Sequence, residues 1–318
     1  MLLDRDTAAW IAASAGAASV RRAERIQSLW SGYGELLRVH LDGGETVIAK
    51  WVKPPARRKN DRADVSDARK RRSYEVETWF YRAYAARCPS RCRVPRFVAS
   101  RVSNGERLLV LEDLDAAGFP ERRRTARPSE LDACLDWLAA FHATFMGAAP
   151  DGLWKVGTYW HLATRREELA AIDDGALREA APVLDRKLAE SRFSTFVHGD
   201  AKLANFCFGR GSSGPVAAVD FQYVGGGCGM KDVAYLLCGD VETDAAEERH
   251  LDVYFRALRA ALVDRGVAID VDALEVEWRA LHPVACADYY RFLAGWSKAY
   301  WNSDIRGRER VRAVLRTL

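Results

Sequence analysis

Residues 196–208, FVHGDAKLANFCF, place four polar side chains inside a segment that is otherwise apolar. These side chains belong to His198, Asp200, Lys202 and Asn205. Burying a polar or charged group costs free energy unless the fold gives it a hydrogen-bond or ion partner. A fold for this chain must therefore either expose the segment as a surface turn or hold these side chains rigidly, as chemistry requires.

The first third of the chain is predicted to begin with a helix and continue as strands. The helix is expected to be capped by Asp6 or Thr7. Two strand-like runs then flank residues 31–34, and the DGG turn at 42–44 predicts a hairpin that leads into a third strand at Thr46–Val52.

The remaining pattern indicates an α+β chain with two lobes. Residues 73–88 carry aromatic side chains at largely helical spacing, and residues 94–114 are typical of two strands joined at SNGE. The rest is mainly helical, apart from two short strands within residues 205–222. With 318 residues, the chain also exceeds the usual size of a single core. We predict a β-rich N-lobe, residues 1–114, with five strands and one internal helix, and a helical C-lobe, residues 115–318.

Charge and cysteine content exclude several classes of protein. The net charge is only +4, from 48 basic and 44 acidic side chains, which is too weak to indicate nucleic acid binding. Basic runs at residues 56–72 and 121–128 favour solvated surfaces, with attraction of an anionic ligand as the alternative. Seven scattered cysteines without a CxxC pair predict neither disulfides nor zinc and favour a cytoplasmic location. No apolar run has the length of a membrane span, so we expect a soluble protein.

Asp200, Asn205 and Asp220 form a set of oxygen-bearing side chains around the two short strands. A hairpin of these strands should bring Asn205 and Asp220 close together. Such oxygen ligands suit Mg²⁺ shared with nucleotide phosphates. Asp200 is then left to accept a proton from a hydroxyl group. The alternative is that Asp200 and Asn205 only form and cap a turn.

Phosphoryl transfer also needs a cation on the phosphates, a carboxylate to hold that cation and a backbone flap. Lys50, near the end of the third strand, is placed to reach inward. Glu77 on the following helix is the carboxylate best phased to meet it, with Glu75 as the competitor. A glycine turn allows backbone to approach phosphate closely. That turn includes Ser31, Gly32 and Gly34.

The chain resembles the protein-kinase-like superfamily of small-molecule kinases, the aminoglycoside phosphotransferase and choline kinase group. Within that group it looks most similar to the ecdysteroid-kinase-like branch. The resemblance spans about residues 31–290 and rests on EVETWFY, LVLEDLDAAGF, LAAFHA, HGDAKLANFCF and VDFQYVGGGCGMKDVAYLL. It implies a bilobal protein-kinase-like fold, ATP and Mg²⁺ as cofactors, and transfer of the γ-phosphate to a hydroxyl of a small-molecule acceptor.

The resemblance also implies roles for individual residues. Asp200 matches the catalytic base, and Asn205 and Asp220 match the metal ligands. Asp232 is expected to brace the catalytic loop from the start of a helix, and His198 to pack and hydrogen-bond within that loop. The matching hinge, whose backbone would meet the adenine, comprises Glu112, Asp113 and Leu114.

Two features bear on the choice between a protein kinase and a small-molecule kinase. Gln222 stands where protein kinases have the glycine of DFG, which favours the small-molecule branch. Lys202 lies two residues after the base, as in Ser/Thr protein kinases, where it would neutralise the transferred phosphoryl group; a solvated loop lysine is the alternative. A protein kinase is disfavoured because the APE segment and activation loop are missing. An inactive nucleotide-binding regulator is disfavoured because base, metal ligands and phosphate lysine are all present.

The acceptor is expected to contact residues 286–301, CADYYRFLAGWSKAYW, which carry six aromatic rings and Asp288 as their only acid. A polycationic aminoglycoside would want several carboxylates there. We therefore predict an apolar alcohol, a sterol-like molecule or an amino alcohol in preference to an aminoglycoside, with a choline or ethanolamine-type kinase as a further alternative. The alternative is that these rings form the core face of a helix. We expect a monomer or homodimer that binds neither nucleic acid nor membrane.

Overall fold

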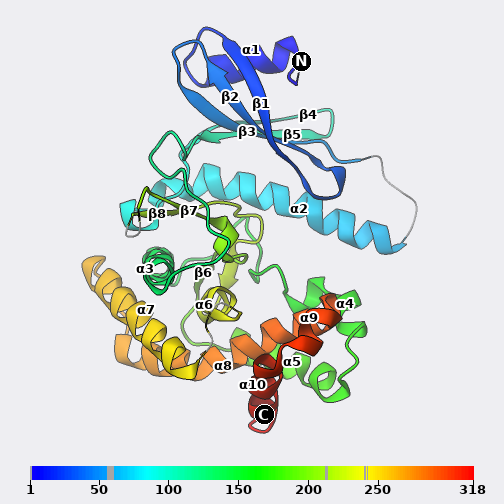
Figure 1. The fold of residues 1–318 in the computed structure, drawn as a ribbon, viewed down its shortest axis with the longest axis vertical. Coiled ribbons are helices and arrows are strands. Elements are labelled where there is room, and N and C mark those ends of the chain that lie inside the picture. Colours follow the sequence, from blue (N-terminus) through cyan, green and yellow to red (C-terminus); the bar gives the residue numbers. More distant parts are fainter. Residues whose placement is uncertain (1, 56–60, 212–213, 240, 242) are drawn as a thin grey trace.

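The chain folds into a five-stranded antiparallel sheet followed by a mainly helical part (Figure 1). The structure is a computed structural model that describes residues 2–55, 61–211, 214–239, 241 and 243–318. The strands are β1 (Val20–Ser28), β2 (Gly34–Leu41), β3 (Thr46–Val52), β4 (Phe97–Ser103), β5 (Glu106–Glu112), β6 (Thr195–Val197), β7 (Phe206–Phe208), β8 (Val216–Ala218) and β9 (Gly225–Gly227). The α-helices are α1 (Arg5–Ser14), α2 (Asp61–Ala83), α3 (Pro128–Thr144), α4 (Arg166–Ala170), α5 (Gly175–Ala189), α6 (Met230–Leu237), α7 (Asp244–Asp264), α8 (Val271–Trp296), α9 (Lys298–Ser303) and α10 (Ile305–Leu315).

The sheet has the order β1-β2-β3-β5-β4, and β3 has the predicted bounds. Successive side chains of a strand point to opposite faces of a sheet. Ala49 and Trp51 of β3 pack in one cluster with Ile11 of α1, which covers that face. Lys50, between them, therefore points to the other face of the sheet, toward α2. This confirms the predicted α+β class and the inward direction of the lysine.

Helix α2 lies between the sheet and the C-terminal helices (Figure 1). Its residues Val76 and Phe80 pack in the main core together with Leu109 and Leu111 of β5. The helix begins at residue 61, twelve residues before the aromatic pattern from which it was predicted. The earlier part is strongly charged, and a solvated charged face gives no apolar period from which to recognise a helix.

The two basic runs differ in their surroundings. Residues 56–60 of the first run lie outside the described residues, and the later part of that run belongs to α2. In the second run, Arg123 and Arg127 both bind Glu130, at 2.7 Å each. These two arginines are thus neutralised locally, as expected of a surface run.

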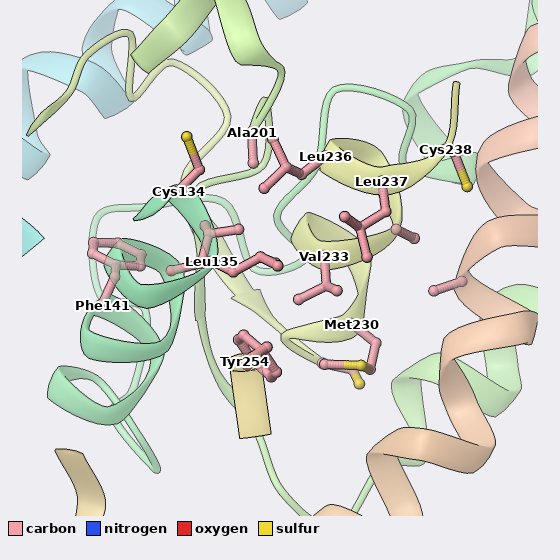
Figure 2. Packing of buried hydrophobic residues seen from close by; sticks show 14 of the residues in the cluster. Cys134, Leu135, Phe141, Ala201, Met230, Val233, Leu236, Leu237, Cys238 and Tyr254 are labelled. Atoms are coloured by element: carbon pink, nitrogen blue, oxygen red, sulfur yellow. The ribbon is translucent and has the colours of Figure 1, made fainter. Parts of the chain in front are cut away.

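The core of the helical part packs α3 against α6 and α7, and α6 against α8. Figure 2 shows Leu135 of α3 pointing toward the α6 residues Val233 and Leu236 across this core. Ala201 points into the same core and is fully buried. Because Ala201 directly follows Asp200, the core fixes the loop on which Asp200 lies.

Three local details differ from the sequence expectations or extend them. Asp4, rather than Asp6 or Thr7, caps α1, since its carboxylate accepts a hydrogen bond of 2.7 Å from the backbone nitrogen of Thr7. Strands β6 and β9 were not predicted, because the glycines of β9 have no strand propensity of their own. The predicted hairpin of β7 and β8 forms, although residues 212–213 of its turn lie outside the described residues.

Among the described helices, none is both long and apolar enough to cross a membrane.

Candidate active site

Lys50 of β3 forms a buried ion pair with Glu77 of α2, with 2.7 Å between Nζ and Oε2. The same ammonium lies 3.2 Å from Oδ1 of Asp220. Glu75 is about half exposed and pairs with Arg72 at 3.4 Å. Two residues correspond to about 200° around a helix, so α2 turns Glu77 inward and Glu75 outward. Of the two carboxylates predicted for Lys50, the structure thus pairs it with Glu77.

Two carboxylates share one ammonium at this point, which perturbs all three groups. Burial alone would lower the pKa of Lys50, but the charges of Asp220 and Glu77 outweigh it and raise that pKa. Burial raises the pKa of Glu77 to about 7, and the nearby charge of Asp220 adds to this effect. Burial also opposes ionisation of Asp220, but Lys50 and Lys202 outweigh it and lower the pKa. Asp220 is therefore the more firmly ionised of the two acids.

Asp200 is held by groups of its own loop. Asn205 donates from Nδ2 to the backbone oxygen of Asp200 at 2.7 Å and to Oδ2 at 2.9 Å. Lys202 donates to the same Oδ2 at 2.8 Å. The other carboxylate oxygen, Oδ1, is buried and has no hydrogen-bond partner among the described residues. Burial raises the pKa of Asp200, against the lowering effect of Lys202.

Asp232 at the start of α6 holds the backbone of this loop. Its carboxylate accepts hydrogen bonds from the backbone nitrogens of His198, at 2.5 Å, and Gly199, at 2.9 Å. It also contacts Nε2 of His142 from α3, at 3.1 Å. Gly199 has φ +81°, and a Cβ there would lie 2.1 Å from the backbone oxygen of Tyr223. Asp232 therefore lies where a brace of the loop is expected, whereas no role was predicted for His142, although it lies in the LAAFHA motif.

The β7–β8 hairpin brings Asn205 beside Asp220. The backbone oxygen of Asn205 accepts a hydrogen bond from Val219, the neighbour of Asp220, at 3.0 Å. Asp220 has φ +68°, a conformation that costs free energy for a residue with a side chain and that recurs at active sites. Ser73 of α2 donates to Oε1 of Gln222 at 3.3 Å, so the residues after Asp220 are tied to the helix that carries Glu77.

The backbone of the turn between β1 and β2 itself requires glycine, independently of any contact with phosphate. Ser31 and Gly32 adopt φ +58° and +73°, and Gly34 adopts φ +128°. A Cβ on Gly34 would lie 1.9 Å from the backbone oxygen of Trp51, so the close pairing of β2 with β3 requires glycine here. Lys70 of α2 donates to Oγ of Ser31 at 2.7 Å, a tether that the sequence did not predict. The contact of this turn with phosphate stays a prediction.

The predicted hinge uses its acidic side chains elsewhere. Glu112 binds Arg93 at 2.6 Å. Asp113 is buried and accepts a hydrogen bond of 2.6 Å from Arg38. Leu114 is buried. Both carboxylates of the hinge are therefore committed to structural ion pairs, and only the backbone of this stretch is left for the predicted contact with adenine.

The aromatic residues of α8 and α9 divide into two groups. Tyr289 contacts the rings of Trp160 and Tyr235, with centroids 5.3 and 4.9 Å apart. Tyr290 and Trp301 are buried against each other among the C-terminal helices, so the core interpretation holds for them. The one acid of the segment, Asp288, is buried and paired with Arg291 at 2.7 Å.

Other rings near Asp200 come from residues that the sequence analysis did not propose for the acceptor site. The backbone nitrogen of Tyr159 donates to the oxygen of Gly199 at 2.7 Å, which places Tyr159 against the loop of Asp200. Its ring meets Tyr223 with centroids 5.0 Å apart. Tyr235 lies close enough to Asp200 that burial and the charge of this carboxylate together raise the pKa of the phenol. An aromatic wall beside Asp200 thus comes from three separate segments.

The fold and these residues define a kinase-like phosphotransferase. A family model described as the phosphotransferase enzyme family APH matches residues 37–269, so the chain belongs to this family and is a phosphotransferase enzyme that acts on a small molecule. No curated protein matches the chain.

Three solved structures illustrate the similarity of fold. An amicoumacin kinase, solved with AMP-PNP and Ca²⁺, is 13% identical with a TM-score of 0.57, over 92% of this chain and 87% of that one. A proposed fructosamine-3-kinase from Thermobifida fusca is 17% identical with a TM-score of 0.55, over 99% and 100%. A choline kinase from Streptococcus pneumoniae is 13% identical with a TM-score of 0.50, over 94% and 95%. At these identities the likeness concerns the fold alone.

Proposed function

We propose that this chain is an ATP- and Mg²⁺-dependent kinase that transfers the γ-phosphate to a hydroxyl group of a small molecule. The observation that carries the proposal is the convergence of two sets of residues. Lys50 and Glu77 come from the sheet and α2, and they meet Asp220, which follows the β7–β8 hairpin. Asp200 lies beside Asn205 at the other end of the same hairpin.

Asp200 is the proposed base. Its Oδ1 takes no part in the bonds to Lys202 and Asn205, so this oxygen accepts the proton of the acceptor hydroxyl. Lys202 and Asn205 hold Oδ2 and thereby orient Oδ1. The raised pKa of Asp200 makes the carboxylate a better proton acceptor than an exposed aspartate. Lys202 also brings a positive charge to the place where the phosphoryl group is transferred.

The residues present fit a nucleotide with a divalent cation. Asp220 is firmly ionised, and Asn205 uses only its amide nitrogen in the bonds to Asp200, which leaves its oxygen for a metal. When bound, the magnesium nucleotide supplies the phosphoryl group and neutralises its charge. Lys50 would contact the phosphates, oriented by Glu77, while Ser31, Gly32 and Gly34 form the flap. The backbone of residues 112–114 would bind adenine.

The aromatic wall near Asp200 supports an acceptor with an apolar body, as an alcohol of the sterol-like or aryl kind has. An aminoglycoside is disfavoured, because Asp288, the only acid of residues 286–301, is neutralised by Arg291. The motifs place the chain nearest to the ecdysteroid-kinase-like branch, and this assignment rests on sequence alone. A cytoplasmic location is consistent with seven cysteines that form no disulfide in the described part of the chain. A monomer or homodimer remains part of the proposal.

The test is a coupled assay of ADP release against a panel of alcohols, amino alcohols, sterols, sugars and aminoglycosides, with Mg²⁺ and ATP. Phosphorylated product should be identified by mass spectrometry. Asp200→Asn is the inactive reference, and Asp272→Asn, at an exposed aspartate, is the matched control that should keep full activity.

Acceptor-dependent ADP release that disappears in Asp200→Asn and persists in Asp272→Asn is the expected result. Nucleotide binding without turnover of any acceptor would favour the regulator instead. Efficient labelling of a peptide library would favour a protein kinase.

A further inference from the structure

A loop of the helical part lies directly against the loop of Asp200. The backbone nitrogen of Tyr159 donates to the oxygen of Gly199, and Arg165 donates from Nε to the backbone oxygen of Tyr159 at 2.6 Å. These hydrogen bonds hold residues 157–165 against Gly199, the residue directly before the proposed base. The charge that this loop carries therefore bears on what can bind beside Asp200.

Arg165 is a buried cation with an unused donor. Its side chain is 2% exposed, and its guanidinium carbon lies 3.9 Å from the centroid of the Tyr159 ring and 5.2 Å from that of Phe292. Nη1 donates to Glu168 at 3.0 Å. Nη2 is buried and has no hydrogen-bond partner among the described residues. A buried donor of a charged group costs free energy when unpaired, so such atoms call for a ligand or an ordered water.

Two further cations come from α2. Arg69 donates to the backbone oxygen of Thr164 at 2.8 Å, and Lys70 donates to Oγ of Ser31 in the glycine turn. Both partners are uncharged oxygens. Burial and the charge of Arg69 lower the pKa of Lys70, Arg165 acts in the same direction, and the opposing effect of Asp67 does not offset them. Arg69, Lys70 and Arg165 thus form one cluster, which we call the cationic cluster.

The ring of Tyr223 lies against the loop that carries Arg165. This ring meets Tyr159, and burial raises the pKa of its phenol to about 12. The charges of Arg165 and Arg69 lower this pKa and the charge of Asp200 raises it, so the phenol lies in the electric field of both sites. Tyr159 contacts both Arg165 and Gly199, the residue before Asp200, so an acceptor bound at this loop lies beside the cluster as well as the base.

We propose that the cationic cluster binds an oxyanion of the acceptor, a carboxylate or phosphate, while the acceptor hydroxyl points to Asp200. Nη2 of Arg165 is the central donor, with Arg69 and Lys70 on the side of α2. Guanidinium and ammonium groups bind such oxyanions through charge-assisted hydrogen bonds. The inference rests on the proposed kinase function. It narrows the range of proposed acceptors, because the cationic cluster repels a cationic amino alcohol.

The test measures binding of three matched probes to the protein saturated with AMP-PNP and Mg²⁺. The probes are 4-(hydroxymethyl)phenylacetate, its neutral carboxamide and the corresponding aminomethyl compound; the matching phosphonate separates a preference for phosphate from one for carboxylate. One charge-assisted bond corresponds to about tenfold or more in affinity, so an anionic probe should bind at least about tenfold more tightly than the carboxamide.

Two variants test whether the cationic cluster causes the preference for anionic probes. Lys70→Met and Arg165→Lys should reduce the ratio of anion to carboxamide affinity to within about twofold, since each removes a donor to the oxyanion. Lys70 is partly exposed, so its variant folds even if Arg165→Lys does not. Arg166→Met is the matched control: this exposed arginine neighbours the cluster in sequence, and its loss should leave the ratio unchanged.

The inference is overturned if the anions bind no better than the carboxamide, if no anionic probe binds, or if both variants keep the preference. It is also overturned if Lys70→Met weakens AMP-PNP binding and leaves the probe ratio intact, because the cluster then serves the nucleotide phosphates. Turnover of neutral alcohols by a protein without anion preference would refute this inference and leave the proposed kinase function standing.

Discussion

Replacing Lys50 by methionine removes the ammonium that Glu77 and Asp220 share. Lys50 and Glu77 are 8% and 2% exposed, and methionine keeps most of the volume of the lysine stem, so the change tests charge more than packing. Without the ammonium, an ionised Glu77 would be a buried and uncompensated charge. We therefore expect the pKa of Glu77, about 7 in the wild type, to rise further in the variant.

The loss of stability in Lys50→Met should then depend on pH. A carboxyl group whose folded pKa is raised above its unfolded value of 4.5 destabilises the folded state progressively as the pH rises, until it ionises in the folded protein as well. In the wild type this loss of stability ends near pH 7, where Glu77 ionises in the folded protein. In the variant the loss continues above pH 7. Each further pH unit costs about 1.4 kcal/mol, so the variant should lose about 2 kcal/mol more at pH 8.5 than at pH 6.

Urea unfolding followed by tryptophan fluorescence at these two pH values measures the difference. The double variant Lys50→Met/Glu77→Gln should lose most of the pH-dependent part, because it lacks the carboxyl group of Glu77, whereas Asp220 still has Lys202 to favour its ionised form. Lys53→Met, at the exposed lysine over the ring of Trp51, controls for the substitution itself. An equal loss at both pH values, or an undiminished pH dependence in the double variant, would refute the reasoning.

Four further outcomes are expected of the active site. Asp200→Asn should lower kcat by about 10² to 10⁴ with little change in nucleotide affinity, measured by turnover and by calorimetric titration. Lys202→Met should move the acidic limb of the pH profile of kcat/KM to higher pH, because Lys202 lowers the pKa of Asp200; an unmoved limb would contradict this assignment. Asp220→Ala should abolish the dependence of nucleotide binding on Mg²⁺, and Glu77→Gln should impair turnover more than Glu75→Gln.

Local sequence patterns were sufficient to predict most of the helices and strands. The alternation of side chains and the DGG turn fixed β3 to the residue, because strand period and turn chemistry act over a few neighbouring residues. The first half of α2 was missed because its supporting contacts are distant in sequence. Arg69 contacts Thr164, and Lys70 contacts Ser31. Such contacts produce no periodic pattern of apolar residues within residues 61–72.

The sequence by itself determined which groups of the active site exist and in what order, since His198, Asp200 and Asn205 lie within eight residues of one another. Only the tertiary structure decided what surrounds them. The phase of α2 selected Glu77 over Glu75, and the packing of residues 157–165 placed Arg165 near Asp200. These outcomes depend on how helices and loops pack on a common core, and such packing joins residues that are far apart in the chain and share no local pattern.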